Sequence, residues 1–392
     1  MLIAGARVLL PGGFEYVDVR TSGDRIAEIG TGLASTPGER VENAAGKLLS
    51  AGLVDLHSHT FTHGFHMAVD ADALSSVTGV TTFVDAGSAG AVGFPSFYEH
   101  VMKRSASRMY AYLNISILGQ TISALQEQGF NENDIHSLVH LPLAEEMIDR
   151  YSDVIRGIKV RAYTNMPDLY PLEQASKLSR NTGLPIMTHI GSAPPAIEDV
   201  LPFLGRGDLV THLYHGGTDT LLDDEGRVRP VFQEARKRGV EFDLGMDRFH
   251  CDLSIMRRAF DQGFYPDYIS SDLTLTNIDS ITFDLPTCIS KCVASGMPLD
   301  TAIEKSTIRV AEKLGISDKV GSIEVGKIAD LALFEWAPSE EPFVDFFGNG
   351  ISDADRLVNT LTIRAGTPLV RNYTQPELWR NSQRAVPWAN YV

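Results

Sequence analysis

Eight short apolar segments recur along the middle of this chain, and each ends in a polar residue. Helical patterns such as LEQASKLSRNTG and VFQEARKRGV lie between several of them. The residues that end the segments are His57, Asp85, Asn114, Lys159, His189, His212, Asp243 and Asp272. Most intervals are close to the roughly 31 residues expected when about 250 residues form eight βα units. Parallel strands buried on both faces read as continuous apolar runs, as these do. The repeat therefore predicts an α/β fold, a (β/α)8 TIM barrel over residues 51–319.

The two ends of the chain have a different texture. Short alternating runs punctuated by glycine and proline, such as LIAGARVLL near the start and NTLTIRAGTPLVRN near the end, are typical of strands and tight turns. Because the ends of a domain often lie close in space, residues 1–50 and 320–392 are predicted to form one small composite β-sandwich. The long interval between Asn114 and Lys159 predicts an insertion after the third barrel strand.

Charge and cysteine usage limit the partners and the compartment. The 392 residues carry 34 Lys and Arg against 50 Asp and Glu, a net charge of −16. This charge argues against non-specific binding to nucleic acid or to an anionic membrane surface, but not against a small anionic substrate. Three cysteines form no disulfide framework, no apolar stretch approaches the roughly 18 residues of a membrane span, and the start lacks the pattern of a signal peptide. A cytoplasmic protein is expected.

The strand ends carry the candidate chemistry. Alternate residues of a strand share a face, so His57 and His59 point the same way. An H-x-H pair is a weak signal by itself, since one histidine can be structural and the other solvated. In a barrel, however, all strand ends converge on one mouth. There the pair would meet a second set from the later strands, namely Lys159, His189, His212 and Asp272. Four imidazoles, a carboxylate and a lysine at one mouth predict a site for two divalent ions.

Lys159 needs a separate argument, because a protonated amine cannot coordinate a cation. Burial lowers the pKa of a lysine, and Ile158 and Val160 give Lys159 apolar flanks. A deprotonated lysine can add carbon dioxide and become a carbamate, an anion whose two oxygens can bridge two metal ions.

The motifs GLVDLHSHTFTHG, GVTTFVDAGSAG, GIKVRAY, MTHIG, VTHLYHG, ISSDLT and GSIEVGKIADLALFE together resemble the amidohydrolase superfamily. Within it, the chain is most similar to the dihydroorotase-like deacetylase branch, whose members include hydrolases of acetylated α-hydroxy carboxylates. The resemblance implies a barrel with a composite β-sandwich and a binuclear centre, usually of zinc. It implies that His57 and His59 bind the buried α metal and that carboxylated Lys159 bridges. His189 and His212 would bind the β metal, and Asp272 would touch the α metal and move the proton.

These ligands suggest how the reaction proceeds. Two adjacent ions lower the pKa of a bridging water, which supplies hydroxide at neutral pH. Asp272 would take its proton and pass it to the leaving group, and no G-x-S-x-G motif offers a serine nucleophile instead. The prediction is a metal-dependent hydrolase of an acyl amide or ester bond in a small carboxylate-bearing substrate, most simply a deacetylase. The alternatives are a dihydroorotase-like cyclic-amide hydrolase and an inactive scaffold with this fold.

Further candidates depend on position alone. Arg161 and Tyr163 follow Lys159 on the same strand face, where Arg161 can clamp a substrate carboxylate or form a salt bridge. His215 is a candidate substrate contact in the loop after the sixth strand. His250, in DRFHCD, follows the seventh strand, where a substrate loop belongs. A homo-oligomer is also expected for a barrel of this class.

Overall fold

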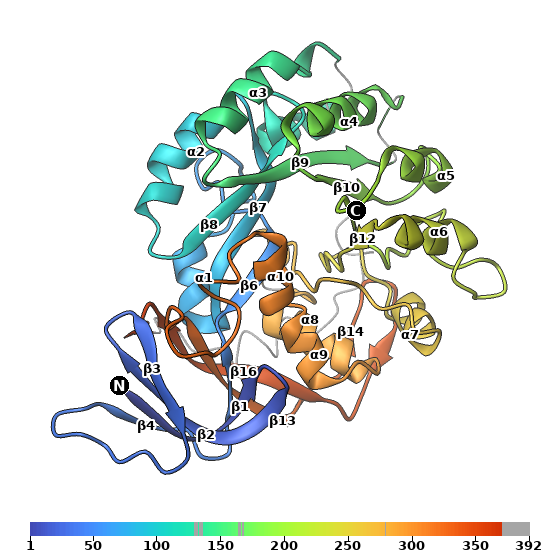
Figure 1. The fold of residues 1–392 in the computed structure, drawn as a ribbon. Coiled ribbons are helices and arrows are strands. Elements are labelled where there is room, and N and C mark those ends of the chain that lie inside the picture. The colour runs from blue at the N-terminus through green and yellow to red at the C-terminus, as the bar shows by residue number, and fades with distance from the viewer. Residues whose placement is uncertain (129–131, 133–135, 164–165, 167, 279, 371–392) are drawn as a thin grey trace.

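The computed structural model describes residues 1–370, apart from 129–131, 133–135, 164–165, 167 and 279. A curled sheet of seven parallel strands, in the order β12-β11-β10-β9-β8-β7-β6, forms its centre (Figure 1). The strands are β6 (Leu53–Ser58), β7 (Val80–Gly90), β8 (Arg108–Asn114), β9 (Ile155–Ala162), β10 (Ile186–Ile190), β11 (Leu209–Thr211) and β12 (Glu241–Phe242). The first seven residues that end the predicted runs lie within these strands or directly after them.

Residues 268–273 close the ring without forming a regular strand. Asp243 forms a parallel bridge with Tyr268, and Ser58 forms one with Leu273. The backbone N–H of Asp272 donates to the carbonyl of His57 at 2.7 Å. This segment thus occupies the eighth position, between β12 and β6. The predicted barrel fold is confirmed, with an irregular extended segment in place of the expected eighth strand.

Helices alternate with the strands and cover the outside of the barrel (Figure 1). Gly183 and Gly239, with φ of 73° and 93°, end the two helices that the sequence predicts, as glycine does at many helix C-termini. The α-helices are α1 (Ala71–Thr78), α2 (Phe94–His100), α3 (Leu141–Arg150), α4 (Tyr170–Thr182), α5 (Ile197–Val200), α6 (Pro230–Arg238), α7 (Leu253–Asp261), α8 (Leu285–Ala294), α9 (Leu299–Glu304) and α10 (Ile308–Lys313). Short 3-10 helices span Met102–Arg104, Gly119–Gln128, His136–Leu138 and Leu201–Phe203.

Strands from residues 2–51 and 331–368 share one eight-stranded sheet (Figure 1). Residues 371–392 of the predicted composite segment lie outside the described residues. Strand β5 pairs antiparallel with β13, so that Leu49 faces Leu333. Buried residues from both ends, including Ile3 and Ile363, form a core separate from that of the barrel. The strands are β1 (Leu2–Leu10), β2 (Gly13–Ser22), β3 (Arg25–Gly30), β4 (Val41–Asn43), β5 (Leu48–Ala51), β13 (Leu331–Pro338), β16 (Asp355–Arg364) and β17 (Thr367–Pro368). A separate hairpin consists of β14 (Phe343–Val344) and β15 (Gly350–Ile351).

The interval between β8 and β9 contains α3 and two of the 3-10 helices, which accounts for its length. Cys288 and Cys292 are buried in α8 as free thiols, and burial raises the pKa of both well above the ordinary value. They serve as packing residues. Among the described residues, no helix combines the length and apolar character needed to cross a membrane.

Candidate metal centre

Side chains from the ends of four strands and from the closing segment meet at one mouth of the barrel. His57 lies in β6, Lys159 in β9 and His189 in β10, while His59, His212 and Asp272 directly follow strands or lie in the closing segment. All six are buried. Their contacts are short: Lys159 Nζ lies 3.2 Å from His57 Nε2, and Asp272 Oδ1 lies 3.0 Å from His59 Nε2. The ring centroids of His189 and His212 are 4.0 Å apart.

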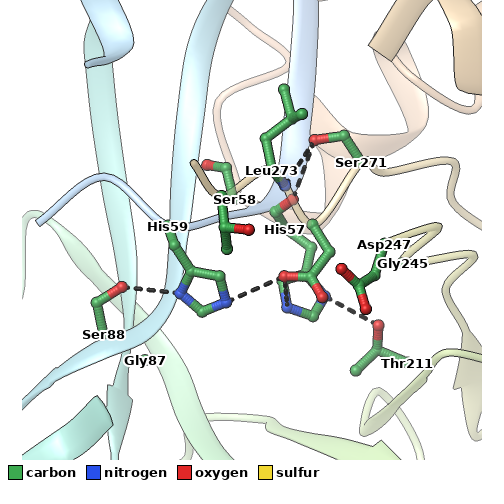
Figure 2. Close-up of polar contacts among 12 residues, drawn as sticks. His57, Ser58, His59, Gly87, Ser88, Thr211, Gly245, Asp247, Ser271 and Leu273 are labelled. Atoms are coloured by element: carbon green, nitrogen blue, oxygen red, sulfur yellow. Dashed lines mark hydrogen bonds and ion pairs between the residues drawn. The ribbon is translucent and has the colours of Figure 1, made fainter. Parts of the chain in front are cut away.

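A hydrogen-bonded serine sets the orientation of His59. Its Nδ1 is hydrogen-bonded to Ser88 Oγ at 2.8 Å, which leaves Nε2 directed towards Asp272 (Figure 2). Asp85 Oδ1 accepts from the backbone N–H of Ser88 at 2.7 Å, and Oδ2 accepts from that of Thr60 at 2.8 Å. Asp85 therefore fixes the backbone that holds the histidine, as partners of metal-binding histidines do.

A relay of three residues sets the tautomer of His57. Thr211 Oγ1 donates to Asp243 Oδ2 at 2.8 Å. Since its only hydroxyl proton is used there, Thr211 accepts from His57 Nδ1 at 2.9 Å (Figure 2). The proton of the imidazole is thereby placed on Nδ1, and the lone pair of Nε2 faces the mouth.

His212 is held by backbone. Its Nδ1 donates to the carbonyl of Gly245 at 2.7 Å. Gly245 has a φ of +47°, and a Cβ there would lie 2.3 Å from Thr211 Oγ1 and 2.9 Å from His212 Nδ1. Only glycine fits this close approach. His212 and Asp272 themselves adopt φ of 69° and 54°, an uncommon conformation for non-glycine residues that is concentrated at functional sites.

Burial controls the protonation of the cluster. Desolvation lowers the pKa of Lys159 to about 7, and it lowers the pKa of His189 and His212 well below the ordinary value. Burial alone would raise the pKa of Asp272, but the adjacent His57 and His59 bring it well below its usual range. Burial alone would lower the pKa of His57, but the adjacent Asp272 carboxylate raises it above the ordinary value. At neutral pH the site thus offers a carboxylate together with neutral imidazoles at His189 and His212.

These donors fit divalent cations. Nε2 of His189 and Nε2 of His212 are buried and have no hydrogen-bond partner in the described part of the chain. A buried imidazole nitrogen without a partner is costly unless something else binds it. Three groups in the described part of the chain have the spacing of metal ligands: His57, His59 and Asp272 form one, His189, His212 and His250 form the second, and Asp247, His250 and Asp272, which shares residues with both, form the third. Imidazole and carboxylate are ligands typical of zinc and related ions.

The predicted substrate contacts lie beside this cluster. Arg161 Nη1 forms an ion pair with Glu132 at 2.7 Å, and its other terminal nitrogen contacts the hydroxyl of Tyr163. The ring of Tyr163 stacks on His189 at 4.5 Å between centroids. His215 is buried and accepts from the backbone N–H of Gly217 at 3.3 Å, and burial lowers its pKa to about 4.

Other polar residues have structural roles. Asn114 bonds the backbone of Gly87 and Ser116, and His140 caps α3. His63 and His66 are exposed.

His250 lies closer to the centre than its sequence position suggested. Its ring centroid is 4.7 Å from that of His189 and 4.4 Å from that of His212. The loop between β12 and α7 carries it back over the mouth. In the sequence, only the position of His250 after the seventh strand indicated a functional role. The conformation of an irregular loop has no periodic signal that could have placed the side chain next to His189 and His212.

A (β/α)8 barrel with such ligands at its mouth defines a metal-dependent hydrolase. Residues 48–353 match the amidohydrolase family, and the chain belongs to that family. It is 30% identical over 342 residues to a deacetylase of Enterococcus faecalis, covering 86% of this chain and 90% of that protein. It is 28% identical over 344 residues to a deacetylase of Agrobacterium fabrum, covering 87% of this chain and 83% of that protein.

Solved structures agree with this assignment. A dihydroorotase superposes with a TM-score of 0.86 at 25% identity, over 94% of this chain and 98% of that one. An adenine deaminase does so with a TM-score of 0.85 at 26% identity, with the same coverage.

Proposed function

We propose that this protein is a deacetylase that hydrolyses an acetyl ester or amide of a small carboxylate-bearing molecule. The observation that carries the proposal is the meeting of four histidines, Lys159 and Asp272 at one mouth. The two deacetylases similar over most of the chain favour acetyl transfer to water among the hydrolyses open to this family.

In this proposal the site holds two divalent ions, most simply zinc. His57, His59 and Asp272 would hold one ion, His189 and His212 the other, and Lys159 would bridge them as a carbamate. When bound, the ions supply a polarised scissile carbonyl and a water of lowered pKa. The carbamate can form because burial lowers the pKa of Lys159 to about 7, which makes the neutral amine available at physiological pH.

Asp272 acts as the general base and then as the general acid. Its pKa is lowered well below the ordinary value, so it is ionised and can accept a proton from the attacking water. The carbonyl carbon gains the water oxygen, the bond to the leaving oxygen or nitrogen breaks, and Asp272 returns the proton to that atom. The products are acetate and an alcohol or amine.

The substrate carboxylate is assigned to Arg161, Tyr163 and His215. Tyr163 contacts both Arg161 and His189. This supports the assignment, because it places the guanidinium group of Arg161 next to the ring of a proposed metal ligand. Arg161→Gln should raise KM more than it lowers kcat. Glu132→Gln breaks the same ion pair while keeping the guanidinium, so it is the matched control and should leave KM within a few-fold of wild type.

A screen of acetylated hydroxy and amino acids tests the reaction. The purified enzyme should release acetate from some of them faster than it opens dihydroorotate. The reverse ratio would favour the cyclic-amide hydrolase, which the similarity to a dihydroorotase makes the second candidate. Less than one equivalent of divalent metal together with no turnover would favour an inactive scaffold. The proposal includes a cytoplasmic location and self-association, which fractionation and light scattering would test.

A further inference from the structure

A third histidine faces the pair formed by His189 and His212. His250 comes from the loop between β12 and α7, and its side chain is 21% exposed. Nitrogen atoms of His189, His212 and His250 lie within 4.8 Å of one another, a spacing at which one cation can contact all three. Neutral imidazoles do not attract one another, and Nε2 of His189 and Nε2 of His212 are buried without a hydrogen-bond partner in the described part of the chain. A cation bound by all three rings would compensate the cost of burying these nitrogens.

Asp247 directs the ring of His250. Nδ1 of His250 donates to Asp247 Oδ2 at 2.5 Å, which leaves Nε2 as the nitrogen with the available lone pair. A carboxylate that accepts from one ring nitrogen while the other faces a metal is the usual support of a histidine ligand.

The position of Asp247 is itself fixed by the closing segment. Asp247 has a φ of 43°, and its N–H donates to the carbonyl of Ser271 at 3.0 Å. Asn277 Nδ2 donates to Asp247 Oδ1 at 3.0 Å and to the carbonyl of Asp272 at 2.8 Å. Asn277 therefore connects the support of His250 with the backbone of Asp272, a residue of the other ligand group.

The end of the loop is also anchored. Asp252 caps α7 by accepting from the N–H of Ser254 at 2.7 Å, and Asn349 Nδ2 donates to the same carboxylate at 3.1 Å. Asp345 accepts from the N–H of Leu253 at 2.8 Å. A histidine held between two such anchors is preorganised for binding.

From this geometry we propose that His250 is a third imidazole ligand of the cation at His189 and His212, oriented by Asp247. With His250, three protein nitrogens would keep that cation bound even in a variant that lacks the Lys159 bridge. The cation at His57, His59 and Asp272 would still need the bridge. The inference rests on the metal dependence of the proposed function but not on the identity of its substrate.

Metal binding measured against a chelator of known affinity tests this assignment. Wild type should bind two equivalents of zinc. His250→Ala and His250→Gln should each bind one of the two about 10–100-fold more weakly or lose it. Asp247→Asn should weaken the same site less. His66→Ala removes an exposed histidine of a neighbouring loop and should match wild type. Circular dichroism and melting temperature verify that each variant is folded.

A double variant separates the roles of the two residues. Lys159→Ala should retain about one equivalent of zinc, and Lys159→Ala combined with His250→Ala should retain almost none. The same comparison can be made with cobalt in place of zinc. The visible d–d absorption bands of cobalt-loaded Lys159→Ala should change or disappear when His250→Ala is added.

Wild-type zinc affinity and stoichiometry in both His250 variants would overturn the inference, and so would unchanged cobalt spectra. Failure of the proposed function has a different signature. An enzyme that binds two ions through His250 but releases no acetate from any acetylated substrate would leave the metal assignment intact and refute the deacetylase.

Discussion

Nζ of Lys159 lies 3.2 Å from Nε2 of His57 in the buried mouth. Burial in this dry site disfavours the charged ammonium form, and desolvation lowers the pKa of Lys159 to about 7. The amine therefore lies beside His57 in a form that can react with carbon dioxide.

Lys159→Ala should abolish hydrolysis, because the variant lacks the anion proposed to bridge the two ligand groups. Short carboxylates such as acetate or propionate, added with zinc, should restore part of the rate by filling the same space. Steady-state assays with and without these additives measure the effect. A variant with a near-normal rate would show that Lys159 is not the bridge.

Reactivation of the metal-free enzyme should depend on pH and bicarbonate. The neutral fraction of the Lys159 amine rises as pH increases through about 7, so loading with zinc and bicarbonate should proceed faster at pH 8 than at pH 6. Carbon-13 bicarbonate should yield one carbamate signal by NMR.

Lys291 provides the control for that signal. It is also a buried lysine of lowered pKa, but its Nζ donates to the carbonyls of Ile281 and Val344 at 2.6 and 2.7 Å. The carbamate signal should vanish in Lys159→Ala and persist in Lys291→Met. Persistence in Lys159→Ala would assign the adduct to another amine.

Thr211→Val should weaken metal binding about 10–100-fold, because it removes the hydroxyl that connects His57 with Asp243. The substitution keeps the side-chain volume, so packing is nearly unchanged. Thr188→Val is the matched control, since Thr188 is buried in β10 with its Oγ1 unpaired among the described residues. Chelator competition should distinguish the two, and equal affinities would argue against the relay.

Gly87→Ala should destabilise the protein and displace Lys159. A Cβ at Gly87 would lie 2.6 Å from Cβ and 2.7 Å from Cγ of Lys159, and the φ of +87° is itself unfavourable for alanine. Gly183→Ala isolates the backbone cost, about 1–2 kcal/mol, because φ there is +73° and no atom would contact the new Cβ. Thermal unfolding should show a clearly larger loss for Gly87→Ala, together with reduced zinc content.

His215 should make the metal-free protein sensitive to acid. Its pKa is about 4 in the folded state and about 6.5 when unfolded. Above pH 6.5 both states are neutral and the group contributes nothing. Between these values only the unfolded state binds the proton, so the free energy of unfolding falls by about 1.4 kcal/mol per pH unit as pH decreases. His215→Gln should reduce the slope by this amount and leave the contribution of His189 and His212, whose pKa values are also lowered, whereas His66→Gln should leave the slope unchanged. Parallel pH profiles for wild type and His215→Gln would contradict the prediction.

The sequence by itself determined the barrel and the six residues at its mouth. Each apolar run reads as a buried parallel strand, and the carboxyl ends of parallel strands in a closed ring meet at one opening. The positions of Lys159 and His189 in the repeat were therefore sufficient to predict that their side chains lie at the same opening. The terminal sheet followed from alternation and glycine turns for a similar local reason.

Only the tertiary structure decided what lies between and around these strands. The loop that returns His250 to His212, the relay from His57 through Thr211 to Asp243, and the pairing of Arg161 with Glu132 join segments far apart in the chain. No periodic pattern encodes them. Loop conformation depends on long-range contacts, such as those that hold Asp247 in its positive-φ conformation, and these exist only once the barrel has closed.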